Sequence, residues 1–475
     1  MALRVSQTLP QPATVGPWGV AAGAALAALG IGVAVAPPLY AIGAVVAVAV
    51  LIGIFIRPEI GLYLLALSVP FQSLSGSDPT QVKLTITEAF VALAMASFFA
   101  RQMAAERPDW RYAPLLRPMA LLLGAMLLSI FKAGDQLQSL KEMAKWLELL
   151  AVYWLAANLL VERRRLVTFL AFLTVGLLLE AALGAAQVVL RIGPPEFLIG
   201  GLILRAYGTF GQPNPFAGYL NLGLPVLLGV ALFTDKGVLR CAAWLAAAYV
   251  ALVMVTTLSR GAWLGFASAL VVIGLLSSRR VATWIWLGLL VVALVIFAAL
   301  FGIIPFAAST RVLAAFGLSG VSLDSVTPDN FSAVQRLAFW QAGLNMFDNN
   351  PVLGVGIGNY IDVYPTYAAQ GWETVLGHAH DYYLNTAAET GLVGLTAYLV
   401  FVGAAFRHVG NVVRGAPKGV WYGVALGLLG SLTAISVHNL VDNMYVHGIP
   451  VLLGLLLGSA TAIFRFQPAD QPVNG

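Results

Sequence analysis

The sequence has little charge and a single cysteine. Only 10% of its 475 residues are charged and 60% are hydrophobic, whereas a soluble globular domain carries about 25% charged residues. This composition excludes an ordinary soluble domain. The one thiol, Cys241, excludes an internal disulfide and a multi-cysteine metal site, so we expect it to act as a small hydrophobic residue.

Long apolar runs take the place of the missing charge. Runs of about 20 apolar residues recur from Val20 to the C-terminus, and they match the roughly 30 Å hydrocarbon layer of a bilayer. In lipid a segment must satisfy its own backbone hydrogen bonds, as a helix does, and the runs lack the alternation of barrel strands. The sequence therefore predicts an all-α polytopic membrane protein. The apolar segments, about 14 in number, lie near residues 17–36, 39–56, 60–74, 86–100, 115–133, 143–161, 166–190, 215–233, 241–258, 262–277, 281–303, 383–406, 419–438 and 448–465.

The positions of lysine and arginine predict which side each loop faces. Cytoplasmic loops carry an excess of these residues, so the loops after even-numbered segments and both termini are assigned to the cytoplasm, with no cleaved signal peptide evident. We divide the chain into an N-terminal transmembrane bundle (1–303), a long periplasmic loop (304–382), and C-terminal transmembrane helices with a short cytoplasmic tail (383–475). The supporting basic residues are Arg4, Arg57, Arg101, Arg107, Arg111, Arg163, Arg164, Arg165, Lys236, Arg240, Arg279, Arg280, Arg407, Arg414, Lys418 and Arg465.

Residues 331–347 of the long loop predict an amphipathic helix on the membrane surface. Apolar side chains recur there mostly every three or four positions, the period of one helix face. The NNP run that follows should end this helix. No strand-to-helix unit surrounds the next run, GVGIGN at 354–359, so we interpret it as a flexible turn and not as a phosphate cradle.

Four arginines stand out on the predicted outer side: Arg205, Arg260, Arg311 and Arg336. Charges beside membrane spans are unfavourable and are therefore functional candidates. A guanidinium group stays charged and binds two phosphate oxygens at once. For each arginine the alternative is snorkelling to the interface or pairing with an acid, but the set on one face favours a site for a phosphorylated ligand.

Four of the five histidines also fall at or near this face. They are His378, His380, His438 and His447. His380, beside Asp381, opens the helix after the long loop, and an imidazole is well suited to accept a proton near neutral pH. A zinc site with His378, or a capping role, is the alternative, although a pair of histidines without a third ligand is weak evidence for metal. His438 and Asp442 could line an acceptor site or cap a helix end.

Two further absences narrow the chemistry. The predicted outer side has no paired-carboxylate motif that would bind a divalent cation beside a diphosphate, and the chain has no nucleotide-binding motif. An enzyme that handles a diphosphate on this face would need cationic side chains in place of a metal. We therefore expect no metal, no cofactor and no nucleic-acid partner.

Four motifs follow one another between about residues 200 and 400. The first three are RAYGTFGQPNPFAGYLNLGLP from Arg205, TLSRGAWLGF around Arg260, and RLAFWQAG…NPVLGVGIGNY from Arg336. The fourth is a histidine and a polar residue (His380 and Asp381), followed after nine residues by Gly-x-x-Gly (Gly391 and Gly394). Together they resemble the O-antigen ligase and O-antigen polymerase superfamily of bacterial membrane glycosyltransferases. Asp381 departs from the Asn, Ser or Gln that is usual there.

The resemblance implies a C-type glycosyltransferase-like fold with about 12 spans, in the bacterial inner membrane, with a periplasmic active site. It implies an undecaprenyl-diphosphate-linked glycan as donor and a sugar hydroxyl of lipid A–core as acceptor. Arg260, Arg336 and Arg205 would bind the diphosphate, in that order of support, with Arg311 least supported. His380 would be the general base of a metal-independent, inverting transfer. Asp381, His438 and Asp442 would support the site or contact the acceptor.

Three alternatives remain open at this point. An O-antigen polymerase of the same superfamily uses the same kind of donor and differs in its acceptor. A secondary transporter would use discontinuous helices such as the region 208–215, but it should also gather polar residues at mid-membrane and show internal repeats. A structural scaffold would leave the arginines and histidines of the outer face unexplained.

Overall fold

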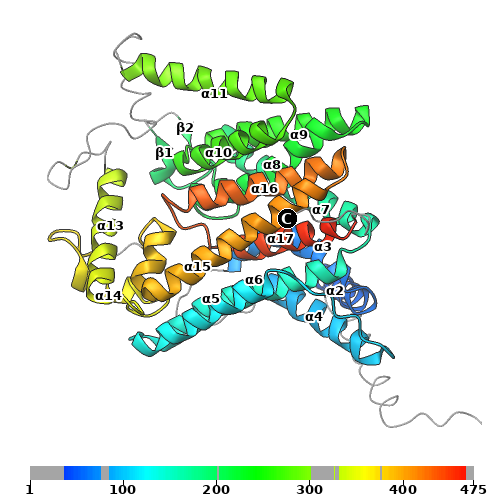
Figure 1. The fold of residues 1–475 in the computed structure, drawn as a ribbon, viewed down its shortest axis with the longest axis horizontal. Helices are drawn as coiled ribbons and strands as arrows, with labels where there is room; N and C mark the ends of the chain where they lie inside the picture. Colours follow the sequence, from blue (N-terminus) through cyan, green and yellow to red (C-terminus); the bar gives the residue numbers. More distant parts are fainter. Residues whose placement is uncertain are drawn as a thin grey trace, which may run out of the picture. The chain divides into compact units, whose positions relative to one another are not determined.

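The computed structural model describes residues 37–75, 85–199, 203–300, 326, 331–374 and 377–466, which are predominantly helical (Figure 1). The α-helices are α2 (Pro38–Ile56), α3 (Glu59–Ser68), α4 (Ile86–Ala104), α5 (Leu116–Ser129), α6 (Gln136–Leu159), α7 (Arg163–Leu190), α8 (Pro213–Phe233), α9 (Gly237–Thr256), α10 (Arg260–Leu276), α11 (Arg279–Leu300), α13 (Phe331–Asn349), α14 (Tyr360–Tyr367), α15 (Tyr382–Gly415), α16 (Val420–His438) and α17 (Ile449–Phe464). The 3-10 helices are η1 (Val69–Ser75), η2 (Ile130–Lys132) and η3 (Pro195–Phe197). Strands β1 (Leu198–Ile199) and β2 (Ile203–Leu204) pair antiparallel, with Leu198 opposite Leu204.

The apolar segments predicted from the sequence coincide with helices, except for 17–36, which lies outside the described residues. Among the described helices, six are long and apolar enough to cross a membrane, namely α2, α7, α8, α9, α15 and α16, while α10, α17 and the stretch 59–72 are shorter apolar helices. The predicted class, an all-α polytopic membrane protein, is confirmed. The number of 12 to 14 spans stays a prediction.

The chain divides into two compact units, residues 1–57 and 58–475, and α2 belongs to the first. Pro38 occupies the first turn of α2, where its fixed φ suits a helix and its missing N–H removes no hydrogen bond. Large apolar side chains along α2, such as Leu39 and Tyr40, are exposed. An apolar helix with so little protein cover is typical of a segment surrounded by lipid.

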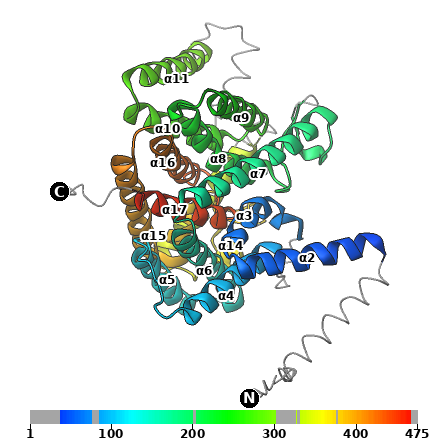
Figure 2. The ribbon, with the colours of Figure 1, turned by 90° about the vertical axis from the view of Figure 1, so that its right-hand side faces the viewer.

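In the second unit, α8 and α10 both pack against α16, and α17 packs against α6 (Figures 1 and 2). Glycine allows α8 and α16 to approach closely. A Cβ atom on Gly229 would lie 1.9 Å from the carbonyl oxygen of Gly423, and one on Gly423 would lie 2.1 Å from that of Gly229. Small residues at such contacts let helix backbones touch and favour helix association in lipid.

Helix α15 is broken at Gly391, whose φ of 64° and ψ of −165° interrupt the helical backbone. The break frees backbone groups that need other partners, and the segment before α14 supplies them. Gly356 N donates to Glu389 O at 2.9 Å, and Leu392 N donates to Pro351 O at 2.8 Å. The two halves of α15 are therefore held by a segment of the long loop.

The GVGIGN run belongs to this supporting segment. Gly354, Gly356 and Gly358 all have positive φ, a region that glycine enters without steric penalty. A Cβ on Gly354 would lie 2.3 Å from the carbonyl carbon of Glu389, and one on Gly356 would lie 2.5 Å from Cα of Ala133. The interpretation as a flexible turn therefore missed the close backbone packing that these glycines permit.

The predicted helix of the long loop is α13, and it ends at Asn349 as the NNP run indicates. Its apolar side chains do not all face outward. Val334, Phe339 and Met346 are buried and Leu344 is 52% exposed, and the helix packs against α14 and α15. Much of the apolar face predicted for the membrane surface is thus covered by protein, because the loop folds back through α14.

Replacing Gly229 with alanine should destabilise the protein, because the new methyl group would overlap Gly423 O and separate α8 from α16. Overpacking of this kind costs about 1–3 kcal/mol, so we expect a lower melting temperature of the purified protein in detergent. The matched control is Gly124→Ala in α5, where a Cβ meets nothing within 4 Å and alanine is the better helix former. Equal melting temperatures for the two variants would contradict the close contact.

Candidate functional site

Side chains from separate parts of the chain line one cavity of about 220 Å³. Arg205 precedes α8, Arg260 begins α10, Arg336 lies on α13, and His380 precedes α15. Asp442, in the segment between α16 and α17, completes the group. The three arginines predicted to bind diphosphate and the predicted base therefore share one cavity, whereas residue 311 lies outside the described residues.

The carboxylate of Asp442 is the common partner of this group and is only 4% exposed. Its Oδ1 accepts hydrogen bonds from His380 Nδ1 and Asn443 N, both at 2.9 Å. Its Oδ2 accepts from Asn214 Nδ2 at 2.7 Å and lies 3.8 Å from Arg336 Nη2. A buried carboxylate requires such partners, because an unpaired charge away from water is strongly unfavourable.

The charge state of Asp442 determines which nitrogen of His380 is basic. Burial alone would raise the pKa of Asp442, but the hydrogen bond from His380 and the positive charge of Arg336 hold it well below its usual range. Asp442 is therefore an anion with no proton to donate. His380 Nδ1 must carry the proton of their hydrogen bond, which leaves Nε2 as the basic nitrogen.

The position of the His380 ring is held by several contacts. Its backbone has a φ of 51°, a left-handed conformation that is uncommon outside glycine and is found at functional sites. Its N–H donates to His378 Nδ1 at 3.1 Å, which is free to accept because burial and the adjacent His380 lower the pKa of His378 to about 4. The ring stacks on Phe339, with centroids 5.7 Å apart and planes at 18°.

Asp381 and His438 occupy different environments. Asp381 Oδ1 accepts from the backbone N–H groups of Tyr383 and Leu384 at 2.9 and 3.0 Å, so it caps the start of α15. His438 lines the cavity and is buried, and a Cβ on Gly261 would lie 2.5 Å from its Cδ2. The structure therefore brings His438 and Asp442 to the cavity but uses Asp381 in a helix cap.

Asn214 is a member of the site that sequence reasoning missed. Arg205 Nη2 donates to Asn214 Oδ1 at 3.0 Å, while Asn214 Nδ2 donates to Asp442, so the amide joins the two charges. Arg205 Nε also donates to Thr257 O at 2.7 Å. The available signal was its place between Pro213 and Pro215 in the QPNPF motif, where a polar side chain enters the first turn of α8.

The three arginines form a concentrated positive charge. Burial, followed by the charges of Arg336 and Arg260, lowers the pKa of Arg205 to about 10, so the group remains a cation at neutral pH. Like charges close together repel. A polyanionic ligand would relieve that repulsion, and the forked guanidinium groups suit the oxygens of phosphate.

His378, His380 and Asp442 also form a cluster of possible metal ligands, whose atoms lie within 4.8 Å of one another. The structure thus supplies a third candidate that lies 62 residues after His380 in the chain. Both oxygens of Asp442 already accept hydrogen bonds, and a cation there would face Arg336. The contacts fit an oriented imidazole better than a metal centre, and the expectation of a metal-free site stays a prediction.

The fold and this cavity define a polytopic membrane protein with a cationic site that contains an Asp–His pair. Residues 245–399, which include Arg260, Arg336 and His380, match the family model described as O-antigen ligase. This part of the chain is therefore similar to the O-antigen ligase family, and the resemblance found in the sequence is confirmed.

Two other comparisons add no further assignment. The comparison with curated proteins found no match. Among solved structures, the chain is similar to one from a structure described as "Structural coordination of polymerization and crosslinking by a peptidoglycan synthase complex", with 18% identity over 76% of this chain and 99% of that chain. The TM-score of 0.42 is too low to establish a common fold.

Replacing Asp442 with asparagine should lower the melting temperature at neutral pH, because Arg336 and His380 lose their anionic partner. The pKa of Asp442 is lower in the folded protein than in the unfolded chain, where it is about 3.9. Its stabilisation is therefore fully present above that value and is lost as the pH falls toward the folded pKa.

We expect the difference in melting temperature between wild type and Asp442→Asn to persist from about pH 7 to pH 5 and to narrow below about pH 4. The measurement is thermal unfolding in detergent across this range. The control is Asp348→Asn, an exposed position on α13, which should match wild type throughout. A difference that widens below pH 4 would contradict the assigned direction of the pKa shift.

Proposed function

We propose that this chain is an O-antigen ligase of the bacterial inner membrane. It transfers a glycan from undecaprenyl diphosphate to a sugar hydroxyl of lipid A–core on the periplasmic side. The observation that carries this proposal is the single cavity that contains Arg205, Arg260, Arg336 and the His380–Asp442 pair. The O-antigen ligase domain match over residues 245–399 supports it.

The three arginines receive the diphosphate of the donor. Negative charge grows on the departing diphosphate as its bond to the sugar breaks. Cations that are already in position stabilise this charge without rearrangement during the reaction. Asn214 and Asp442 hold Arg205 and Arg336 in place through the contacts at 3.0 and 3.8 Å, so the guanidinium groups are oriented before the donor binds.

His380 activates the acceptor. Its Nε2 takes the proton of the acceptor hydroxyl, whose oxygen forms a bond to the anomeric carbon on the side opposite the diphosphate. The bond between that carbon and the diphosphate oxygen breaks, its electron pair leaves with undecaprenyl diphosphate, and the anomeric configuration inverts. The proton stays on His380, where the Asp442 carboxylate stabilises the imidazolium through the 2.9 Å hydrogen bond.

Purified wild-type protein in detergent with EDTA should transfer the lipid-linked glycan onto rough lipopolysaccharide. His380→Ala should lower kcat by roughly 10²–10⁴, the usual contribution of a general base, in protein whose cooperative thermal melt shows that it is still folded. The control is Asp381→Asn, because asparagine also caps a helix and that variant should stay active. For wild type and both variants, transfer is measured by the shift of the lipopolysaccharide band on gels.

Each other outcome has a distinct meaning. An active His380→Ala protein would rule out the general-base role but not the ligase. Loss of wild-type activity in EDTA would rule out the metal-free mechanism. Chain growth on lipid-linked repeat units, without transfer to lipopolysaccharide, would make the protein an O-antigen polymerase, which shares the donor and differs in its acceptor.

Replacing Arg336 or Arg260 with lysine should lower kcat/KM for the donor by about 10- to 100-fold, the scale of one hydrogen bond to a charged group. Lysine keeps the charge but cannot bind two oxygens in a fork. The matched control is Arg191→Lys, an exposed arginine outside the cavity, which should leave the donor kinetics unchanged. Equal effects at Arg191 and Arg336 would contradict a donor site at these arginines.

A further inference from the structure

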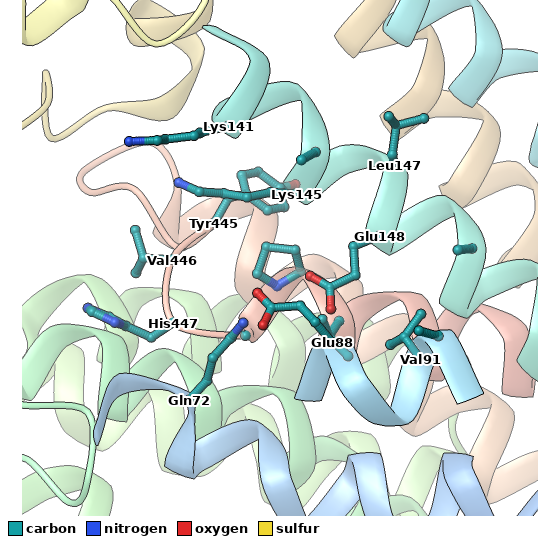
Figure 3. Close-up of a pocket in the computed structure, with 16 residues that line it drawn as sticks. Gln72, Glu88, Val91, Lys141, Lys145, Leu147, Glu148, Tyr445, Val446 and His447 are labelled. Atoms are coloured by element: carbon teal, nitrogen blue, oxygen red, sulfur yellow. The ribbon is translucent and has the colours of Figure 1, made fainter. Parts of the chain in front are cut away.

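A second cavity, of about 790 Å³, is larger than the arginine-lined cavity of 220 Å³ and contributes nothing to the mechanism above (Figure 3). Residues of η1, α4, α6 and the segment 445–451 line it. One connection serves both cavities. The residues between α16 and α17 place Asp442 in the first cavity and Tyr445, Val446 and His447 in the second.

The second cavity is amphipathic. In Figure 3, Lys141, Lys145 and His447 lie toward one side of it, and Leu147 and Val91 lie toward the other. A ligand with an apolar chain and an anionic head group matches this division, because the chain would cover the apolar wall and the head group would meet the lysines. The cavity thus fits a lipid that carries phosphate.

The two lysines oppose the usual charge distribution of a membrane protein. Hydrogen bonds from Asp135 N to Asn359 Oδ1 (2.7 Å) and from Ser139 Oγ to Ile357 O (2.6 Å) join the beginning of α6 to the segment that supports α15. Under the orientation predicted from the sequence, this end of α6 faces the outer side, where lysine and arginine are normally depleted. Lys145 already pairs with Glu142, its Nζ lying 2.6 Å from a carboxylate oxygen. A phosphate in the cavity would give the two lysines a further anionic partner.

Hydrogen-bond acceptors occupy the middle of the cavity. The carboxyl groups of Glu88 and Glu148 both lie there (Figure 3). The buried atoms Glu148 Oε1 and Gln72 Oε1 have no hydrogen-bond partner within the described part of the chain. Unpartnered buried acceptors are unfavourable, so a ligand that carries hydroxyl groups would satisfy them.

We propose that this cavity binds the acceptor, a glycolipid with apolar chains, phosphate and sugar hydroxyls. The chains lie along Val91 and Leu147, the phosphate meets Lys141 and Lys145, and hydroxyl groups donate to the acceptors at the centre. The assignment as acceptor rests on the proposed function, in which the donor diphosphate occupies the arginines. In this arrangement the glycolipid is anchored in the larger cavity, and its reacting sugar hydroxyl extends past the connection between α16 and α17 to His380 in the smaller one.

The test measures binding directly, with rough lipopolysaccharide as the probe and the full chain in detergent. The double variant Lys141→Gln/Lys145→Gln removes the charge. Ala92→Trp fills the cavity from an exposed position on α4, so the protein core is not disturbed. We expect each to weaken lipopolysaccharide binding by about tenfold, with binding of undecaprenyl diphosphate unchanged and KM in the transfer assay raised for the acceptor alone.

Two matched controls separate the cavity from general effects. Lys132→Gln removes an exposed lysine at the end of η2, and Ala96→Trp adds the same bulk one turn further along α4; neither residue lines the cavity. Both should bind lipopolysaccharide like wild type. Melting temperatures show whether each variant is folded. The two cavity variants change different helices, so if one fails to fold, the other still tests the cavity.

Several results would overturn the inference. The first is unchanged lipopolysaccharide binding in both cavity variants. The second is wild-type protein that binds dephosphorylated lipopolysaccharide as tightly as the phosphorylated form. The third is weaker binding of undecaprenyl diphosphate by the cavity variants, which would mean that the cavity binds the donor. The failure of the proposed function looks different. Wild-type protein that binds lipopolysaccharide through this cavity but transfers no glycan would overturn the ligase and leave the glycolipid site.

Discussion

The site depends on one buried anion. Asp442 is almost fully removed from solvent, and a carboxylate in that position is stable only if donors and cations surround it. Its partners come from α8, α13 and the start of α15, which are far apart in the sequence. The need to pair this charge therefore holds Asn214, Arg336 and His380 around one cavity, and it also determines the tautomer of His380.

A second constraint supports the first. Helix α15 must break at Gly391, and the broken backbone would be intolerable in lipid unless protein groups satisfied it. The segment with the GVGIGN run provides these hydrogen bonds and packs so closely that glycine is required at several positions. The left-handed conformation of His380 lies two residues before α15 begins at Tyr382. Strained backbone of this kind persists where the surrounding structure over-determines it.

The two cavities divide the properties that a transfer between two lipid-linked substrates needs. The smaller one concentrates cations and the Asp–His pair, which suits a diphosphate and a proton transfer. The larger one offers apolar walls with lysines at one side, which suits an anionic lipid. One short connection between α16 and α17 lines both cavities, with Asp442 in the smaller and Tyr445, Val446 and His447 in the larger. In our proposals this connection brings donor and acceptor together.

The sequence by itself determined the membrane class and the positions of the helices, because long apolar runs report burial in lipid one segment at a time. The predicted segments 215–233 and 419–438, for example, agree closely with α8 and α16. The motifs also indicated Arg205, Arg260, Arg336 and His380. Only the tertiary structure decided that these side chains meet, that Asp442 orients His380, and that Asn214 bridges Arg205 to Asp442. It also showed that Asp381 caps the start of α15 and that the GVGIGN glycines allow close backbone packing. Local periodicity and composition describe each segment alone, whereas these contacts depend on which helix ends the fold brings to one place.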